Sequence, residues 1–189
     1  HSVNAAHFDP AAAAPRTEAL RLRAELGITD RRVVLFAGKF SPAKQPVELL
    51  EAFLAVATSR DALVFVGDGA EKPRLEALAA SRPDVLVRFL PFANQSEMPA
   101  RYLLADVFAL PSKGHYETWG LAVNEAMHLG VPCLGSDGVG CQRDRVTPGE
   151  TGWVFTAEDP TALRAALNAA LRAPATELRK LGDQARARV

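Results

Sequence analysis

Two glutamates, Glu117 and Glu125, have the clearest chemical potential in this sequence, and seven residues separate them. If both lay on one helix, eight steps of about 100° would set them about 80° apart around the axis and ~12 Å apart along it. They could then share neither a proton nor a metal ion. If Glu117 lies in the polar loop before the helix, both carboxylates can flank one elongated ligand with hydroxyls to donate, such as a ribose or a sugar ring. The alternative is a solvated charge pair on a surface helix.

The start of the helix that carries Glu125 is a predicted anion site. We expect Thr118 to cap this helix, which would run to Leu129 and end at Gly130 in the left-handed conformation. Three backbone amides would then point out of the helix start without internal partners, those of Trp119, Gly120 and Leu121. A helix N-terminus carries about half a positive charge and binds phosphate well.

Two lysines, Lys39 and Lys44, lie on one loop after the first predicted strand. Ser41 and Pro42 between them favour a fixed turn. Two cations beside a helix-end anion site suit a diphosphate, which side chains and amides would neutralise together. The alternative is a pair of solvated surface lysines, the commoner situation for lysine in general.

Short apolar, β-rich runs alternate with helical segments from about residue 32 onward. The predicted strands cover residues 32–37, 62–66, 85–90, 106–110, 131–135 and 153–155. The predicted helices cover residues 16–26, 47–58, 71–80, 96–104, 119–129, 160–171 and 177–188. This alternation predicts an α/β fold, a Rossmann-like doubly wound parallel sheet. Ligands bind at the carboxyl ends of such strands, where the loops at 38–45, 67–71, 92–96, 111–117 and 135–141 would converge.

One of these loops, Gly67-Asp68-Gly69, has two interpretations. It is either a bare turn or a place where a base or ribose approaches the backbone closely. No Gly-x-Gly-x-x-Gly follows the first strand, so the dinucleotide-binding fingerprint is missing.

Composition limits the classes of function. The chain has 189 residues with 22 basic and 22 acidic side chains, so no overall field attracts nucleic acid. Its apolar runs are too short to span a bilayer, and its histidines show no metal-ligand spacing. Cys133 and Cys141 form no Cys-x-x-Cys motif, which favours a reducing cytoplasm. Residues 1–15 are rich in Ala and Pro, and we expect a connecting segment there that lies outside the core.

The segment 117–127, Glu-Thr-Trp-Gly-Leu-Ala-Val-Asn-Glu-Ala-Met, resembles the signature of the retaining GT-B glycosyltransferases of family four. Several shorter segments agree: Gly38-Lys39-Phe40 with Lys44, Gly67-Asp68-Gly69, 94–99, Ala105-Asp106-Val107, Leu110-Pro111-Ser112, Gly130-Val131-Pro132 and 149–153. The resemblance covers about residue 30 to the end. Residues 1–8 also resemble the segment that leads from the family's first domain into its second.

The resemblance implies a domain that binds a nucleoside-diphosphate sugar, over residues 16–189, as one half of a GT-B fold. Glu117 would be the catalytic residue at the hydroxyls of the transferred sugar, and Glu125 would meet the ribose hydroxyls. The other donor-binding residues would be Gly38, Lys39, Lys44, Gly69, Glu71, Phe92, Thr118, Trp119, Gly120 and Leu121. Of these, the lysines and the helix-start amides would hold the diphosphate, and Phe92 and Glu71 would lie near the base.

Neither a metal nor a cofactor is implied, in keeping with the lack of an Asp-x-Asp motif. The family commonly has Arg where Lys39 stands, and lysine keeps the charge but loses the planar, two-pronged grip.

The resemblance further implies that residues 1–15 are an interdomain linker and that an acceptor-binding domain precedes residue 1. This chain alone would then bind nucleotide without transferring sugar, and any peripheral membrane association would come through the missing domain. Three alternatives stay open. A non-catalytic nucleotide- or phosphate-binding module would be indifferent to Glu117, and a sugar-nucleotide epimerase-like enzyme could use the same architecture. A pure interaction domain would give no reason for the glutamates and lysines to converge.

Overall fold

Six parallel strands form one sheet in the computed structural model, which describes residues 5–113, 120–138 and 145–189. The strands are β1 (Arg32–Ala37), β2 (Asp61–Val66), β3 (Leu86–Leu90), β4 (Val107–Leu110), β5 (Cys133–Ser136) and β6 (Gly152–Phe155). Their order across the sheet is β3-β2-β1-β4-β5-β6. This is the order of a Rossmann fold, and the direction of winding reverses between β1 and β4. The predicted doubly wound sheet is therefore confirmed, and all six predicted strands are present.

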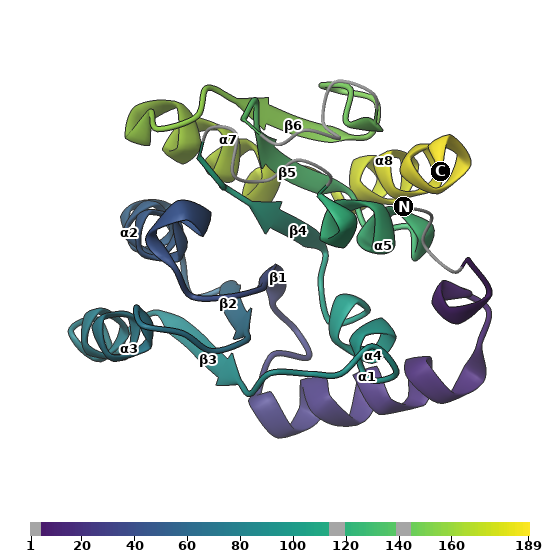
Figure 1. The fold of residues 1–189 in the computed structure, drawn as a ribbon, viewed down its shortest axis with the longest axis horizontal. Helices are drawn as coiled ribbons and strands as arrows, with labels where there is room; N and C mark the ends of the chain where they lie inside the picture. Colours follow the sequence, from purple (N-terminus) through teal and green to yellow (C-terminus); the bar gives the residue numbers. More distant parts are fainter. Residues whose placement is uncertain (1–4, 114–119, 139–144) are drawn as a thin grey trace.

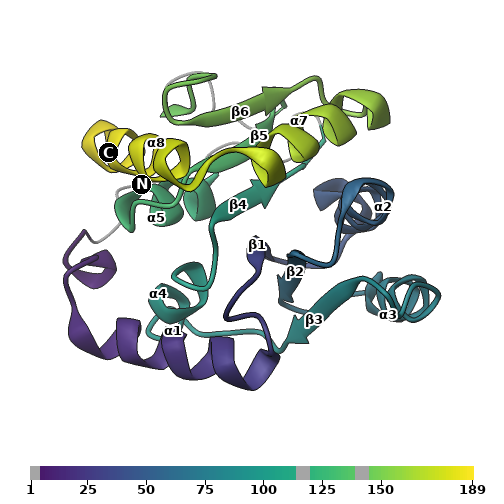
Figure 2. The same ribbon diagram turned by 180° about the vertical axis from the view of Figure 1, so that it is seen from behind.

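Helices cover both faces of the sheet (Figures 1 and 2). One face packs against η1 (Ala5–Phe8), α1 (Ala13–Leu26), α4 (Met98–Tyr102) and α5 (Leu121–His128). The other packs against α2 (Pro46–Val56), α3 (Lys72–Ala80) and α7 (Pro160–Arg172). A short helix, η2 (Pro42–Lys44), precedes α2, and α8 (Ala175–Arg188) lies beside α5.

Burial on both faces explains why the strands are continuous apolar runs. In β1, Val33 and Leu35 belong to the core under α1, α4 and α5, whereas Val34 and Phe36 belong to the core under α2, α3 and α7. Successive side chains of a strand point to opposite faces, so a sheet covered on both sides has no position for a polar residue in its centre.

Two predictions about the helices need correction. Helix α4 is shorter than the predicted 96–104, because the Asn94 side chain accepts hydrogen bonds from Ser96 Oγ (2.6 Å) and from the Glu97 amide (3.1 Å). These bonds form a turn that delays the helix start. The expectation that residues 1–15 lie outside the core is also wrong at Phe8, which is 1% exposed and packs against Tyr102. The Ala- and Pro-rich composition of the segment does not indicate that Phe8 is buried.

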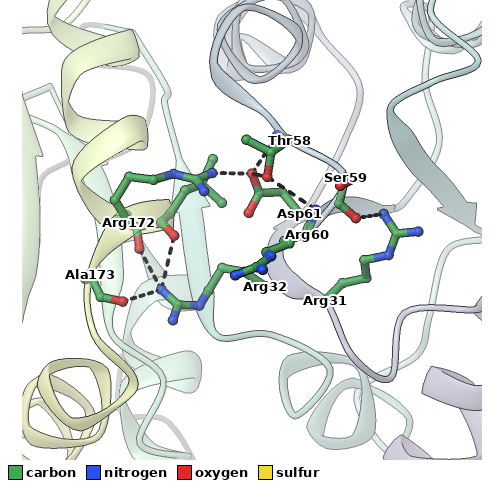
Figure 3. A network of polar contacts seen from close by, with 10 residues as sticks. Arg31, Arg32, Thr58, Ser59, Arg60, Asp61, Arg172 and Ala173 are labelled. Carbon is green, nitrogen blue, oxygen red and sulfur yellow. Dashed lines mark hydrogen bonds and ion pairs between the residues drawn. The ribbon is translucent and has the colours of Figure 1, made fainter.

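The amino-terminal edge of the sheet is fixed by a polar network (Figure 3). Asp61, at the start of β2, is fully buried, and its Oδ2 accepts from the Thr58 amide (2.8 Å) and pairs with Arg172 of α7. Arg32, at the start of β1, donates to the carbonyl oxygens of Ala170, Leu171 and Ala173 where α7 ends (3.2, 3.3 and 2.7 Å). These bonds satisfy carbonyls that a helix end leaves without internal partners.

In the described part of the chain, no helix has both the length and the apolar character needed to cross a membrane.

Candidate functional site

The loops at the carboxyl ends of β1, β2 and β4 are joined by backbone hydrogen bonds. The Lys113 amide, after β4, donates to the Ala43 carbonyl in the loop after β1 (2.9 Å). Between the loops after β1 and β2, the Phe40 amide donates to Asp68 (2.8 Å) and the Glu71 amide donates to Phe40 (3.0 Å). Three loops that are far apart in the sequence therefore form one continuous edge, on either side of the switch point between β1 and β4.

The glycines of the loop after β2 have a packing role that neither of their two interpretations included. Gly67 has φ 147°, and a Cβ atom there would lie 2.0 Å from the Gly38 carbonyl oxygen. Gly69 has φ 152°, and its Cβ would lie 2.7 Å from the Phe40 carbonyl oxygen. The loop is thus more than a bare turn, because its backbone approaches another loop of the protein closely. A contact between Gly69 and a ligand stays a prediction.

The two predicted lysines both lie on this edge but differ in their surroundings. Lys39 is exposed, whereas Lys44, the last residue of η2, is partly buried. A Cβ atom at Gly38 would lie 3.4 Å from Cδ of Lys44, so the lysine stem lies close to Gly38. The pair can therefore present one exposed and one partly buried cation to an anion at the switch point.

Helix α5 begins at Leu121, and its N-cap is Gly120 with φ 49°. The prediction of Thr118 as the cap is wrong, because glycine readily takes the left-handed conformation that this cap requires and threonine does not. The Gly120 carbonyl accepts from the amides of Val123 (2.9 Å) and Asn124 (3.2 Å), which are the first bonds within the helix. Leu121 and Ala122 are therefore the first two residues of α5, and sequence reasoning did not include Ala122 among the residues of the helix start.

Three predicted site residues lie outside the described residues: Glu117, Thr118 and Trp119. Apart from the cap at Thr118, their predicted contacts with a ligand remain predictions.

Glu125 lies in the middle of α5 and is partly buried. Its Oε2 accepts a hydrogen bond of 2.7 Å from the hydroxyl of Tyr102, which belongs to α4 and is 1% exposed. Burial raises the pKa of the Glu125 carboxyl, while the Tyr102 hydrogen bond and the nearby His7 act in the opposite direction. Burial, together with the adjacent Glu125 carboxylate, raises the pKa of Tyr102 well above its usual value. Tyr102 therefore keeps its proton and donates a hydrogen bond to Glu125.

No local feature of the sequence indicates this partnership, since Tyr102 and Glu125 are 23 residues apart and on different helices. An aromatic side chain shortly before a buried strand is typical of core packing alone.

The residues predicted for a base lie on the neighbouring loops. Phe92, just after β3, is 77% exposed. Glu71 is the N-cap residue of α3, and its carboxylate lies 3.7 Å from Arg74. The Gly67 amide donates to the Leu90 carbonyl (3.1 Å), which joins the ends of β2 and β3. An exposed aromatic ring on this edge offers a surface on which a planar base can stack.

Taken together, the structure brings Gly38, Lys39, Lys44, Gly69, Glu71, Phe92, Gly120 and Leu121 to the carboxyl edge of the sheet, with Glu125 on the adjoining helix. Cations and helix-end amides near the switch point suit phosphates, and a carboxylate on the helix suits hydroxyls. Within the ranges 5–113, 120–138 and 145–189, no three His, Cys, Asp or Glu residues are grouped to hold a metal ion.

The curated proteins with similar sequences include glycosyltransferases. The chain is 37% identical over 162 residues to a D-inositol 3-phosphate glycosyltransferase from Geodermatophilus obscurus, covering 79% of this chain and 35% of that protein. It is 35% identical over 158 residues to a GDP-mannose-dependent alpha-mannosyltransferase from Mycolicibacterium smegmatis, covering 82% of this chain and 38% of that protein. The chain thus spans little more than a third of the length of these curated relatives.

A solved structure shows the same fold. Anabaena HepE, in complex with UDP-glucose, superposes with a TM-score of 0.83 at 22% identity, over 98% of this chain and 50% of HepE. The predicted relation to one half of a GT-B fold is therefore confirmed. The family model described as glycosyl transferases group 1 matches residues 19–188, and the chain belongs to this family.

Proposed function

We propose that this chain is the donor-binding domain of a retaining glycosyltransferase, which moves a sugar from a nucleoside-diphosphate sugar to an acceptor. The observation that carries the proposal is the bond between the Lys113 amide and the Ala43 carbonyl, which joins the loops after β1 and β4. This bond keeps the Lys44 loop beside the loop that leads into α5, at the reversal of winding where doubly wound sheets bind nucleotides.

The curated relatives support the class of reaction. Both are named as glycosyl- or mannosyltransferases, and one of the names specifies GDP-mannose as the donor. Because the match covers 35% and 38% of these relatives, we propose that an acceptor-binding domain outside these 189 residues completes the catalytic cleft. We also propose that the isolated chain binds nucleotide without transferring sugar.

The proposed chemistry follows from the leaving group. When the bond between the anomeric carbon and the diphosphate oxygen breaks, negative charge builds up on the nucleoside diphosphate and positive charge on the sugar. Lys39, Lys44 and the amides at the start of α5 would stabilise the diphosphate as this charge develops. Glu117 would hold hydroxyls of the transferred sugar. For retention, the acceptor would attack the face from which the diphosphate departs.

Calorimetric titration of the 189-residue chain with UDP, GDP and ADP, each beside its monophosphate, tests this proposal. We expect at least one diphosphate to bind, about tenfold or more tightly than its monophosphate, because the second phosphate meets the lysines and the helix end. Equal affinity for diphosphate and monophosphate, or no binding of any, would contradict the proposal. In the whole protein, Glu117→Ala separates an enzyme from a non-catalytic binding module, since only the enzyme loses turnover.

A further inference from the structure

Tyr102 has a buried hydroxyl whose position is set from two sides. Its ring centroid lies 5.3 Å from that of Phe108 on β4, in an edge-to-face arrangement, and 6.2 Å from that of Phe8 on η1. With 1% of its surface exposed, the side chain has no room to take another rotamer without displacing one of these rings.

The segment that carries Phe8 is itself attached to the carboxyl edge of the sheet. His7 Nε2 donates to the carbonyl of Gln95 in the loop after β3 (2.6 Å). The neighbouring Phe8 ring is thereby held against Tyr102. Three elements therefore fix the direction in which the Tyr102 hydroxyl points: η1, α4 and β4.

The Tyr102 hydroxyl points toward Glu125, which belongs to the candidate site. The Tyr102 hydroxyl donates to Oε2 of Glu125 over 2.7 Å, from α4 to α5. A glutamate side chain has several rotamers, and a bond from an immobile donor to one carboxylate oxygen selects among them. The bond engages Oε2 and restricts the orientation of the Glu125 carboxylate. Because burial raises the pKa of Tyr102, its hydroxyl keeps its proton and remains the donor in this bond.

We propose that Tyr102 is a positioning residue, which orients the Glu125 carboxylate so that it accepts hydrogen bonds from the ribose hydroxyls of the bound nucleotide. This inference rests on the proposed function, in which Glu125 meets the ribose. Tyr102 does not touch the ligand, because its side chain is buried; it acts through Glu125. The N-terminal segment thereby contributes to nucleotide recognition through Phe8.

A purely structural role for Tyr102 makes a different prediction from a positioning role. Loss of core packing or stability would weaken the binding of every ligand equally. Loss of carboxylate orientation would weaken only ligands that carry the ribose hydroxyls.

The experiment compares UDP with 2′,3′-dideoxy-UDP by calorimetry, for the wild-type chain and for Tyr102→Phe, or uses GDP or ADP in both forms if that base binds better. We expect wild type to prefer the hydroxylated nucleotide and Tyr102→Phe to lose about five- to tenfold in affinity for it, since a hydrogen bond to a charged group is removed. Affinity for the dideoxy form should stay within about twofold of wild type. In Glu125→Ala the preference for the hydroxylated form should disappear.

The matched control is Thr151→Val, which also removes a buried hydroxyl. The Thr151 hydroxyl accepts from the Thr147 amide (2.8 Å) and donates to the Arg145 carbonyl (3.0 Å), away from Glu125. This variant should leave both affinities unchanged. A second variant, Phe8→Leu, keeps both polar partners and loosens one wall around Tyr102. It should weaken binding of the hydroxylated nucleotide less than Tyr102→Phe does, again without affecting the dideoxy form.

Equal weakening of both nucleotides by Tyr102→Phe, or no weakening of either, would overturn the positioning role and leave the proposed function intact. If Tyr102→Phe does not fold, the same comparison with Phe8→Leu decides the question. A wild-type chain that binds none of UDP, GDP and ADP would overturn the proposed function and, with it, this inference.

Discussion

The two edges of the sheet use polar groups in opposite ways. At the amino edge, charged side chains bond to one another and to the backbone, as Asp61 does with Arg172 and the Thr58 amide. At the carboxyl edge, backbone bonds between loops provide the structure, and the exposed groups include Lys39 and Phe92. A charge that the protein itself satisfies contributes to stability, whereas an exposed cation on a rigid loop can meet a ligand.

The same contrast applies to two carboxylates that are both removed from water. Asp61 is fully buried and has an ion pair with Arg172. Glu125 is partly buried, has a hydroxyl donor but no ion pair among the described residues, and its pKa is raised by burial. Burial of a carboxylate that has no ion pair lowers the stability of the folded chain. Such destabilised groups are common at sites that bind ligands.

The largest effect on stability is expected at Gly67, where the loop after β2 touches the loop after β1. Gly67→Ala adds a Cβ that would lie 2.0 Å from the Gly38 carbonyl oxygen, at φ 147°. We expect a loss of about 2–5 kcal/mol in the free energy of unfolding, from backbone strain and overlap together. Urea denaturation measures it. Gly149→Ala is the control, since it meets no atom within 4 Å at φ 75° and should cost only about 1 kcal/mol.

An equal cost for Gly67→Ala and Gly149→Ala would show that contact between the loops does not maintain the carboxyl edge.

The second-largest effect on stability is expected at the amino edge of the sheet. Asp61→Ala leaves Arg172 and the Thr58 amide without their buried acceptor, and we expect a loss of about 2–4 kcal/mol in the free energy of unfolding. The affinity for nucleotide should not change, because the site lies at the other edge. Thermal or urea unfolding and calorimetry measure the two quantities. Asp84→Ala breaks a solvent-exposed pair with Arg82 and should change the free energy of unfolding far less than Asp61→Ala does.

If Asp61→Ala lowers the affinity for nucleotide in a fully folded sample, this would contradict the view that the amino edge serves stability and the carboxyl edge serves binding.

The smallest expected effect on the free energy of unfolding is that of Glu125→Gln, and it is a gain in stability instead of a loss. Because burial raises the pKa of Glu125 in the folded chain, the wild type loses stability as the pH rises from the ordinary glutamate value through the folded-state pKa. Glu125→Gln removes this titration and can still accept from Tyr102, while His7, which lies nearby, is unchanged. At pH 8 we expect this variant to be more stable by less than about 1 kcal/mol, because solvent screens the partly exposed carboxyl, and to bind nucleotide more weakly.

Below the ordinary glutamate pKa the two proteins should be equally stable. Unfolding curves from pH 4 to pH 8 measure the difference, and a difference that does not change with pH would show that Glu125 does not titrate as an unpaired, partly buried acid.

The sheet could be predicted from sequence because its signals are local. Runs such as Val33 to Phe36 are apolar throughout, as burial on both faces requires, and their alternation with helices fixes the fold class. The lysine loop and the Glu125 helix could be placed at one edge for the same reason. The cap at Gly120 and the partnership of Tyr102 with Glu125 could not, because they depend on backbone conformation and on contacts between separate helices. Phe8 was missed because its neighbours in the sequence are typical of a linker.

The most direct test of the central claim is the affinity of the Lys44→Ala chain for its nucleoside diphosphate. We expect binding to weaken about ten- to a hundredfold, because a charge-assisted contact with the diphosphate is lost. Lys180→Ala, an exposed position on α8, is the matched control and should bind as the wild type does. Unchanged affinity for Lys44→Ala, with the wild type binding, would remove this lysine from the site and contradict the assignment of the diphosphate to the junction of β1 and β4.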